Sequence, residues 1–451
     1  MCSAASFLIR NVQVVNEGRI ETMDVFLAHG KIQRLGKISD SEIFSDTTVI
    51  DGNNKYLFPG VIDAHVHFRE PGLTHKATIK TESMAAVAGG VTSFLEMPNT
   101  LPPTTSESTL REKLHIAAQN SFANYGFFIG VTSDNLTEVL HLPKGLACGI
   151  KLFLGSSTGN MLVNDHAVIE QLFAEAELPI VVHCEDEHII QTNTAAFKAK
   201  YPHLDAPASI HPLIRTEEAC YKSSAFAVDL ATKHNTRLHI AHITTAKELS
   251  LLSNESLSQK KRITAEVTPT HLWFCDDDFR RLGNLIKSNP SIKSKADRQA
   301  LREALAIGKI DLVATDHAPH TLEEKQKNYF EAPSGLPCIQ HSLLTLLELH
   351  ADNEITLPRI AEVMSHNPAT LFGIQNRGFI REGYAADLVL TTPDDCETVC
   401  RENLFYKCSW SPLSGEIFHH KILSTWVNGE RIYHEGKIQS SVKGQPLEFQ
   451  A

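Results

Sequence analysis

The sequence lacks several features that mark common classes of protein. None of its nine cysteines stands in a Cys-x-x-Cys pair, which favours free thiols over a disulfide framework or a structural zinc knuckle. No uninterrupted run of about 18 apolar residues occurs, and residues 1–10 lack the basic start and apolar core of a secretion signal. We therefore expect a soluble, cytoplasmic protein that makes no contact with a membrane.

Positive charge is also scarce, because 42 Lys and Arg face 53 Asp and Glu and leave a net charge of −11. A nucleic-acid partner would need a basic face, so this balance argues against one. Hydrophobic residues make up 42% of the chain, enough for a buried core, which excludes an intrinsically disordered protein. Histidine is abundant, with 23 residues, and this directs attention to metal ligands and proton-transfer groups.

Short β-rich runs occur at both ends of the chain. Residues 1–57 contain the runs 7–15, 24–27, 32–35 and 48–50, separated by turn residues. The same pattern returns in residues 371–451, in the runs 387–390, 423–427 and 430–433. We predict that the two ends together build one small β-sandwich domain.

The middle of the chain, residues 58–370, alternates apolar runs with segments of helix length. Eight such runs occur, at 61–66, 91–97, 125–131, 149–154, 179–183, 237–243, 262–267 and 310–315. This alternation predicts an α/β fold, a (β/α)8 TIM-like barrel in which parallel strands are covered by helices. The alternative is an open doubly wound sheet, but no Gly-x-Gly-x-x-Gly follows the first strand to mark its dinucleotide site.

Titratable residues gather where these apolar runs end. In a barrel the carboxyl ends of the strands meet at one rim, where chemistry collects. Histidines two residues apart also share one face of a strand. The residues in question are His65 and His67 at the end of the first run, Lys151 in the fourth, His183 and His242 at the ends of the fifth and sixth, and Asp316 just after the eighth. Histidines and a carboxylate at such a rim predict a site for zinc or a similar divalent ion.

Lys151 does not fit a simple metal site, because an ammonium group has no lone pair to offer a cation. One interpretation is a lysine that pairs with a carboxylate or extends its amine to solvent. The other is a lysine whose pKa is lowered by burial among cations and whose amine reacts with carbon dioxide. The resulting carbamate would carry two oxygens that could bridge two metals.

Several motifs resemble those of the dihydroorotases of the amidohydrolase superfamily, and the resemblance covers nearly the whole chain. The most specific are Asp-Ala-His-Val-His-Phe-Arg-Glu-Pro-Gly at 63–72 and Glu-Met-Pro-Asn-Thr at 96–100. They are joined by Gly-Ile-Lys-Leu-Phe at 149–153, Val-His-Cys-Glu at 182–185, Ala-His-Ile-Thr at 241–244 and Ala-Thr-Asp-His-Ala-Pro-His at 314–320.

The resemblance implies a reaction and a metal centre. Dihydroorotases reversibly cyclise N-carbamoyl-L-aspartate to L-dihydroorotate in de novo pyrimidine (UMP) biosynthesis. By this resemblance two Zn²⁺ ions share the ligands His65, His67, His183, His242 and Asp316. N6-carboxylated Lys151 bridges the ions, which places the chain in the lysine-bridged branch. A zinc-bridging hydroxide would attack the ring amide, with Asp316 as general acid and base.

The substrate carries a carboxylate, and Arg69 offers the planar fork that pairs with one through two hydrogen bonds. The resemblance adds Asn99 and His320 to the carboxylate site and places Asn289 and the backbone of Gly335 against the ring. It also implies a homodimer. The small polar segment 155–160 suits a lid that closes on the substrate, and we expect Thr158→Ala to lower turnover.

Two other functions stay open. A related cyclic amidase, such as a dihydropyrimidinase, hydantoinase or allantoinase, would share the metal rim, but a substrate without a carboxylate would leave Arg69 buried and unpaired. An inactive homologue could instead serve as a structural partner of aspartate carbamoyltransferase. Such homologues tend to lose metal ligands, whereas all of the predicted ligands are present here.

Overall fold

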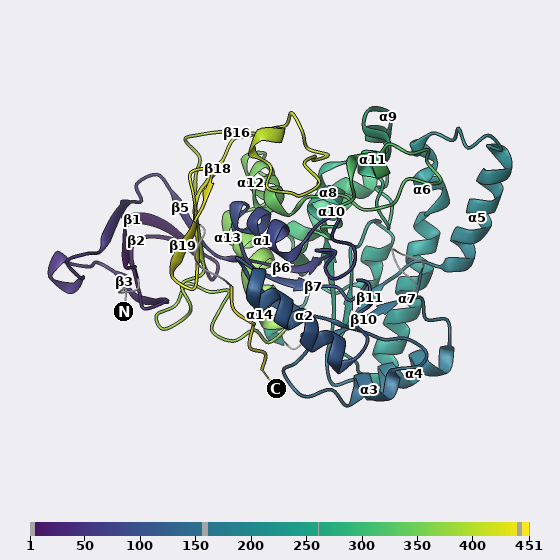
Figure 1. Ribbon diagram of the computed structural model, residues 1–451, viewed down its shortest axis with the longest axis horizontal. Helices are drawn as coiled ribbons and strands as arrows, with labels where there is room; N and C mark the ends of the chain where they lie inside the picture. The colour runs from purple at the N-terminus through teal and green to yellow at the C-terminus, as the bar shows by residue number, and fades with distance from the viewer. Residues whose placement is uncertain (1–4, 156–160, 260, 440–443, 451) are drawn as a thin grey trace.

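The computed structural model describes residues 5–155, 161–259, 261–439 and 444–450. Apart from Gly155, the segment predicted to be a lid, with its Thr158, lies outside the described residues. The described chain divides into a β domain and a larger α/β barrel, seen on the left and right of Figure 1.

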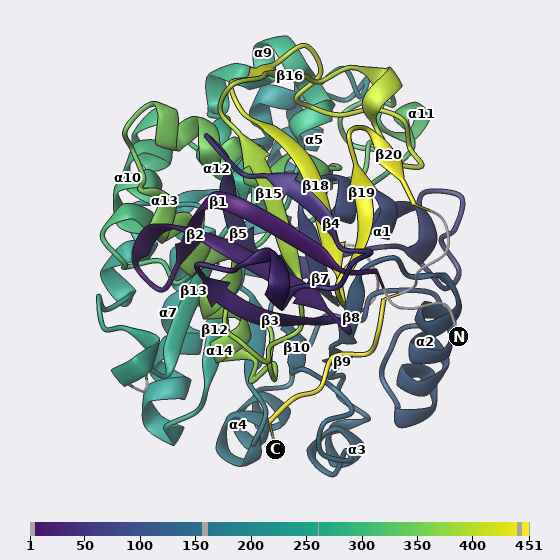
Figure 2. The same ribbon diagram turned by 90° about the vertical axis from the view of Figure 1, so that its left-hand side faces the viewer.

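The β domain contains a nine-stranded sheet in the order β20-β19-β18-β15-β5-β1-β2-β3, with β4 paired to β1. Strands from both ends of the chain therefore lie side by side, as Figure 2 shows for β1, β5, β15 and β18. The strands are β1 (Phe7–Asn16), β2 (Arg19–Ala28), β3 (Lys31–Gly36), β4 (Thr48–Asp51), β5 (Tyr56–Pro59), β15 (Leu388–Thr392), β18 (Lys421–Val427), β19 (Glu430–His434) and β20 (Lys437–Ile438). A separate pair consists of β16 (Glu397–Thr398) and β17 (Ile417–Phe418).

Alternation along these strands explains why the domain folds. Phe7 and Ile9 of β1 face one apolar cluster, which includes Trp426 of β18, while Leu8 between them faces another. The ring of Phe7 meets that of Trp426 edge-on at 5.8 Å. The prediction that both termini build one β domain is confirmed, whereas its boundaries at residues 57 and 371 stay predictions.

The barrel contains eight parallel strand positions, one of them split into two short strands. Neighbouring strands pair in parallel from β6 to β8 and from β9 to β14. A parallel bridge between Val66 and His317 closes the ring, and the backbone N–H of His67 donates to the carbonyl of His317 at 2.8 Å. The strands are β6 (Val61–Val66), β7 (Val91–Glu96), β8 (Asn124–Phe127) with β9 (Ile129–Gly130), β10 (Ile150–Phe153), β11 (Ile180–His183), β12 (Leu238–Ile240), β13 (Ile263–Val267) and β14 (Leu312–Val313). The predicted barrel is confirmed, and with it the choice against an open sheet.

Helices surround the barrel (Figure 1). Several begin directly after a strand-end loop, where a side chain accepts a hydrogen bond from the first turn, as Thr78, Asp186 and Thr216 do. In the described part of the chain, no helix is both long and apolar enough to cross a membrane. The helices are α1 (Ile79–Ala88), α2 (Glu107–Asn120), α3 (Leu136–Leu140), α4 (His166–Glu175), α5 (Glu187–Lys200), α6 (His211–Ile214), α7 (Glu217–His234), α8 (Pro269–Trp273), α9 (Phe279–Leu282), α10 (Lys295–Ala306), α11 (Leu322–Lys325), α12 (Ser342–Ala351), α13 (Leu357–Ala361) and α14 (Asn367–Leu371).

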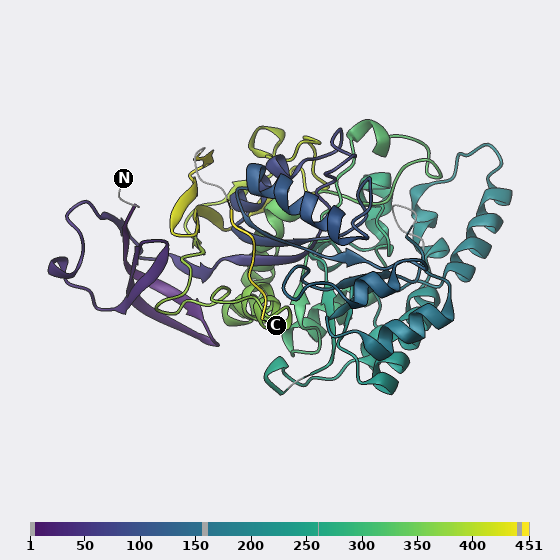
Figure 3. The ribbon, with the colours of Figure 1, turned by 60° about the horizontal axis from the view of Figure 1, so that its bottom comes forward.

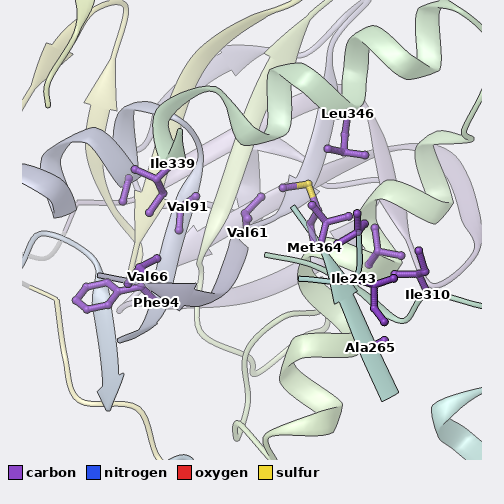
Figure 4. Close-up of a cluster of buried hydrophobic side chains, with 14 of the residues drawn as sticks. Val61, Val66, Val91, Phe94, Ile243, Ala265, Ile310, Ile339, Leu346 and Met364 are labelled. Carbon is purple, nitrogen blue, oxygen red and sulfur yellow. The ribbon is translucent and has the colours of Figure 1, made fainter. Parts of the chain in front are cut away.

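The barrel strands are buried on both faces. Outward side chains pack beneath the helices, and Figure 4 shows Val61, Val91 and Phe94 of this layer together with Leu346 of α12. Inward side chains form a second cluster that includes Leu95 and Phe128. This interior cluster extends to Phe372, directly after α14, and to Leu447 in the C-terminal segment, which Figure 3 shows running along the barrel. Apolar packing therefore fills much of the interior, and the residues predicted to bind metal lie at the opposite, carboxyl ends of the strands.

Candidate active site

Strand alternation explains which residues reach the barrel mouth. In β11, Ile180 and Val182 join the outer cluster, whereas Val181 joins the inner one, so His183 points inward at the end of the strand. Lys151 lies between the outward Ile150 and Leu152 of β10 and also points inward. All six residues predicted to bind metal therefore come to one rim.

One group at this rim consists of His65, His67 and Asp316. Their ligand atoms all lie within 4.8 Å of one another. The Oδ1 atom of Asp316 is 2.9 Å from Nε2 of His67 and 3.4 Å from Nε2 of His65. Two ring nitrogens and a carboxylate oxygen that converge in this way form a set of ligands for a divalent ion.

His183 and His242 form a second group beside the first. Nδ1 of His183 lies 3.0 Å from Nε2 of His242, and the two rings meet edge-on. The ring centres of His242 and His65 are 5.4 Å apart, so the two groups are neighbours. Lys151 is fully buried, and its Nζ has no hydrogen-bond partner among the described residues. Two ring nitrogens and an amine nitrogen without a hydrogen-bond partner therefore lie beside the first group and could hold a second ion.

Carboxylate and amide oxygens orient three of the histidines. Nδ1 of His65 contacts Glu266, and Nε2 of His183 lies 3.0 Å from Glu185. Nδ1 of His67 lies 2.7 Å from Oδ1 of Asn99. If each ring nitrogen donates its N–H to the oxygen beside it, the other nitrogen keeps a lone pair for metal, which is the usual arrangement around metal-bound histidine.

Three groups of this rim, the Lys151 amine, the His67 ring and the Asp316 carboxylate, have shifted pKa values. Burial lowers the pKa of Lys151 to about 8 and that of His67 to about 4. Burial acts to raise the pKa of Asp316, but His65 and His67 hold it well below its ordinary range. The carboxylate is therefore ionised at neutral pH, the histidine is neutral, and about a tenth of the lysine amine is uncharged at pH 7.

The backbone around the site adopts conformations that side chains rarely favour. The φ angles of Arg69, His242 and Asp316 are 67°, 37° and 49°. Such left-handed residues cluster where function requires a particular side-chain direction. Asp63 holds this geometry in place, because its carboxylate accepts from the backbone N–H of Thr315 at 3.0 Å and from the Thr315 hydroxyl at 2.6 Å.

A small cavity opens beside the first metal group. Its lining residues are His67, Arg69, Asn99, Asn289, Asp316, Ala318, Ser334 and Gly335. Arg69 is 1% exposed, and burial lowers its pKa to about 10, so it remains charged at neutral pH. Its Nε donates to the carbonyl of Pro319 at 3.0 Å, and Nη2 lies 3.1 Å from Nε2 of His320. No carboxylate lies within ion-pair distance of Arg69 in the described parts of the chain.

Two further residues shape this cavity. Oδ1 of Asn289 is buried and lacks a partner within the described ranges. Gly335 has a φ of 126°, and a Cβ at this position would lie 2.6 Å from the carbonyl oxygen of Ala318. Only glycine therefore lets this loop approach the cavity so closely.

The structure thus brings together every residue that the sequence predicted for the site, although their roles stay predictions. Asn99, predicted for the substrate carboxylate, contacts His67 as well. Sequence reasoning missed Glu185 and Glu266, which orient ligands. Their positions in the sequence could have indicated them, because Glu266 stands near the end of the run 262–267 and Glu185 lies two residues after His183.

Comparison with known proteins identifies the family. Residues 56–432 match the model of the amidohydrolase family. The chain belongs to the amidohydrolase family. This amidohydrolase is 36% identical to the dihydroorotase of Halobacterium salinarum over 436 residues, which cover 96% of this chain and 97% of that protein. It is 33% identical to the dihydroorotase of Pyrococcus furiosus over 414 residues, or 92% of this chain and 90% of that protein.

Solved structures confirm the fold of this dihydroorotase-like amidohydrolase. The L-hydantoinase (dihydropyrimidinase) of Arthrobacter aurescens superposes with a TM-score of 0.92 at 26% identity and covers 98% of this chain and 99% of that one. The dihydropyrimidinase of Brevibacillus agri superposes with a TM-score of 0.86 at 23% identity and covers 96% of each chain. The barrel with its β domain is therefore shared with enzymes of different names, and the choice among substrates depends on the site.

Proposed function

We propose that this amidohydrolase is a dihydroorotase, which interconverts N-carbamoyl-L-aspartate and L-dihydroorotate. The observation that carries the proposal is Arg69, a buried guanidinium that faces the cavity and pairs with no carboxylate of the described chain. A buried charge without a partner is costly, so a substrate that supplies the missing carboxylate is favoured. The dihydroorotases among its full-length relatives support the same substrate.

The donor set at the rim fits two zinc ions and a bridging carbamate. His65, His67 and Asp316 would hold one ion, and His183 and His242 the other. The neutral amine of Lys151 would add to the carbon of carbon dioxide and release one proton, which gives a carbamate with two oxygens. When bound, the two ions would supply Lewis acidity to the amide carbonyl and a more acidic water.

Asp316 is the residue that would move protons. Its carboxylate lines the cavity and also faces the histidines, so Oδ1 or Oδ2 can take a proton from the attacking water and deliver it to the leaving ring nitrogen. Cyclisation requires the reverse transfers through the same atoms, as microscopic reversibility demands.

The opposite wall of the cavity would hold the substrate. The fork of Arg69 suits two parallel hydrogen bonds to a carboxylate, and His320 lies beside it. Asn289 and the backbone at Gly335 flank the same space and would contact the ring. We further propose that the enzyme acts as a homodimer, which sedimentation would test.

The decisive experiment measures turnover of L-dihydroorotate by purified protein of known zinc content, with dihydrouracil and allantoin in parallel. We expect selective opening of L-dihydroorotate and its loss in Arg69→Ala, while the zinc content stays unchanged. Turnover of dihydrouracil or allantoin instead would support a cyclic amidase, the second candidate, which the similarity to L-hydantoinase favours. No turnover at all, with zinc bound, would support a structural homologue.

A further inference from the structure

A single loop carries two cations to the same histidine. Arg69 begins the loop and Lys76 ends it, and backbone hydrogen bonds from Leu73 N–H to Arg69 and from Lys76 N–H to Leu73 keep it compact. Nη2 of Arg69 lies 3.1 Å from Nε2 of His320, and Nζ of Lys76 lies 3.0 Å from its Nδ1. The imidazole is thus contacted on both nitrogens by groups that only donate hydrogen bonds.

The position of the single ring proton follows from these contacts. Burial and Arg69 lower the pKa of His320 well below its ordinary value, so the ring is neutral. Neither Lys76 nor Arg69 has an acceptor atom, so the proton lies on the ring nitrogen that has a different acceptor within hydrogen-bond distance. That nitrogen is Nε2, and Nδ1 accepts from Lys76. Nε2 lies 2.9 Å from the carbonyl oxygen of Ser334, which can accept that proton. Arg69 lines the cavity, and the N–H of His320 lies directly behind Gly335 and Ser334 of the cavity wall, next to Nη2 of Arg69. Two donors therefore meet here beside the single carbonyl of Ser334.

Lys76 is itself held in position. Its side chain is 12% exposed, and Nζ pairs with Glu324 of α11 at 3.1 Å. Glu324 also approaches Nδ1 of His320, at 3.7 Å, and is the acceptor available to that nitrogen if Lys76 is removed. In that case Nδ1 would carry the proton toward Glu324, and Nε2 would become an acceptor for Arg69. His320 would then have no N–H at Nε2, and the N–H of Arg69 that bonds to Nε2 would also be occupied. Neither group could donate to a bound anion.

We propose that Lys76 is a positioning residue for substrate specificity, which sets the tautomer of His320 so that Nε2–H and Arg69 together bind the carboxylate of the substrate. This inference rests on the proposed dihydroorotase function. Lys76 acts through His320 and needs no contact with the substrate. Its effect is therefore confined to substrates that carry the carboxylate.

Lys76→Met and Lys76→Arg test the inference, with Lys407→Met as the matched control. Lys407 is exposed and donates to the carbonyl of Thr74 in the same loop, so its removal also deletes one positive charge and one contact there. Steady-state kinetics would give kcat and KM for L-dihydroorotate. Calorimetry on metal-stripped protein would give the dissociation constants of L-dihydroorotate and of dihydrouracil, the same ring without the carboxylate.

We expect Lys76→Met to raise KM and the dissociation constant for L-dihydroorotate roughly tenfold, the effect of one lost charge-assisted hydrogen bond, with little change in kcat. Binding of dihydrouracil should not change, Lys76→Arg should restore most of the affinity, and Lys407→Met should resemble the wild type. An unchanged dissociation constant, or an equal loss for both rings, would overturn the inference. Calorimetry decides this without turnover, so a wild-type protein that fails to open L-dihydroorotate refutes the proposed function separately.

Discussion

The two walls of the active site differ in how their polar groups are partnered. On the metal side, Glu266, Glu185 and Asn99 each face a ring nitrogen of a histidine, so the acceptors are built into the fold. On the opposite side, which we call the anchor side, Arg69 presents donors that no carboxylate in the described ranges neutralises.

This difference teaches what each wall is built to receive. Acceptors behind the histidines leave lone pairs at the rim, which attract cations. Donors that exceed the available acceptors attract an anion. A substrate with a carboxylate at one end and an amide at the other would span both walls, and changes to one wall should leave the function of the other intact.

Asp316→Asn is the change with the largest expected effect. The amide keeps the shape of the side chain but loses the charge beside His65 and His67 and the capacity to transfer a proton. We expect kcat to fall by about 10³-fold or more, within the range for lost acid–base catalysis. The loss in kcat should be equal for any ring that the enzyme opens, because Asp316 does not bind the carboxylate of the substrate. A kcat within tenfold of the wild type would contradict this role.

Glu266→Gln should weaken metal binding without changing the anchor. The carboxylate of Glu266 contacts His65 and lies 3.0 Å from Nε2 of His239. It also accepts from the backbone N–H of His242 at 3.3 Å. We expect zinc affinity, measured by competition with a chelator, to fall by roughly 10–100-fold. Glu324→Gln, on the anchor side, is the control and should keep its zinc. Equal zinc affinity in both variants would show that Glu266 does not orient the ligands.

Gly335→Ala should affect the anchor wall alone. A Cβ at this position would lie 3.0 Å from Nε2 of His320 and closer still to the backbone of Ala318, so the loop must move. We expect KM for L-dihydroorotate to rise by about tenfold while zinc content and kcat change little. Thermal unfolding would show whether the variant folds, and an unchanged KM in a folded variant would place the substrate elsewhere.

The barrel was predictable from the sequence because apolar strands of a parallel sheet are continuous runs. The predicted run 61–66 coincides with β6, and the run 310–315 contains the much shorter β14. The run 125–131 proved to be two strands, β8 and β9, separated by Phe128, whose side chain joins the interior cluster. Such interruptions depend on packing between distant segments, which local patterns do not encode.

The site was predictable as far as side chains follow the strand ends. The residues predicted to bind metal, together with Arg69 and His320, stand at or just beyond the strands. Glu185 was passed over because a carboxylate beside a histidine is common in sequences, and only the fold shows that it faces Nε2 of His183 and Arg215 together. Lys76 lies in a loop seven residues after Arg69, and no periodicity links it to His320.

Glu185 also provides the smallest of the expected effects, a dependence of stability on pH. Burial acts to raise its pKa, but Arg215 and His183 lower it to about 2, from 4.5 in an exposed side chain. A carboxylate with a depressed pKa stabilises the fold above its ordinary pKa, and this contribution is lost as the pH falls toward 2. In metal-stripped protein, Glu185→Gln should lower the Tm by roughly 5 °C or less near neutral pH. The difference in Tm between this variant and the wild type should become smaller as the pH drops below 4.5. A difference in Tm that stays constant with pH would show that the charge of Glu185 does not stabilise the metal side of the site. The metal side would then depend on the shape of this side chain alone, unlike the anchor side.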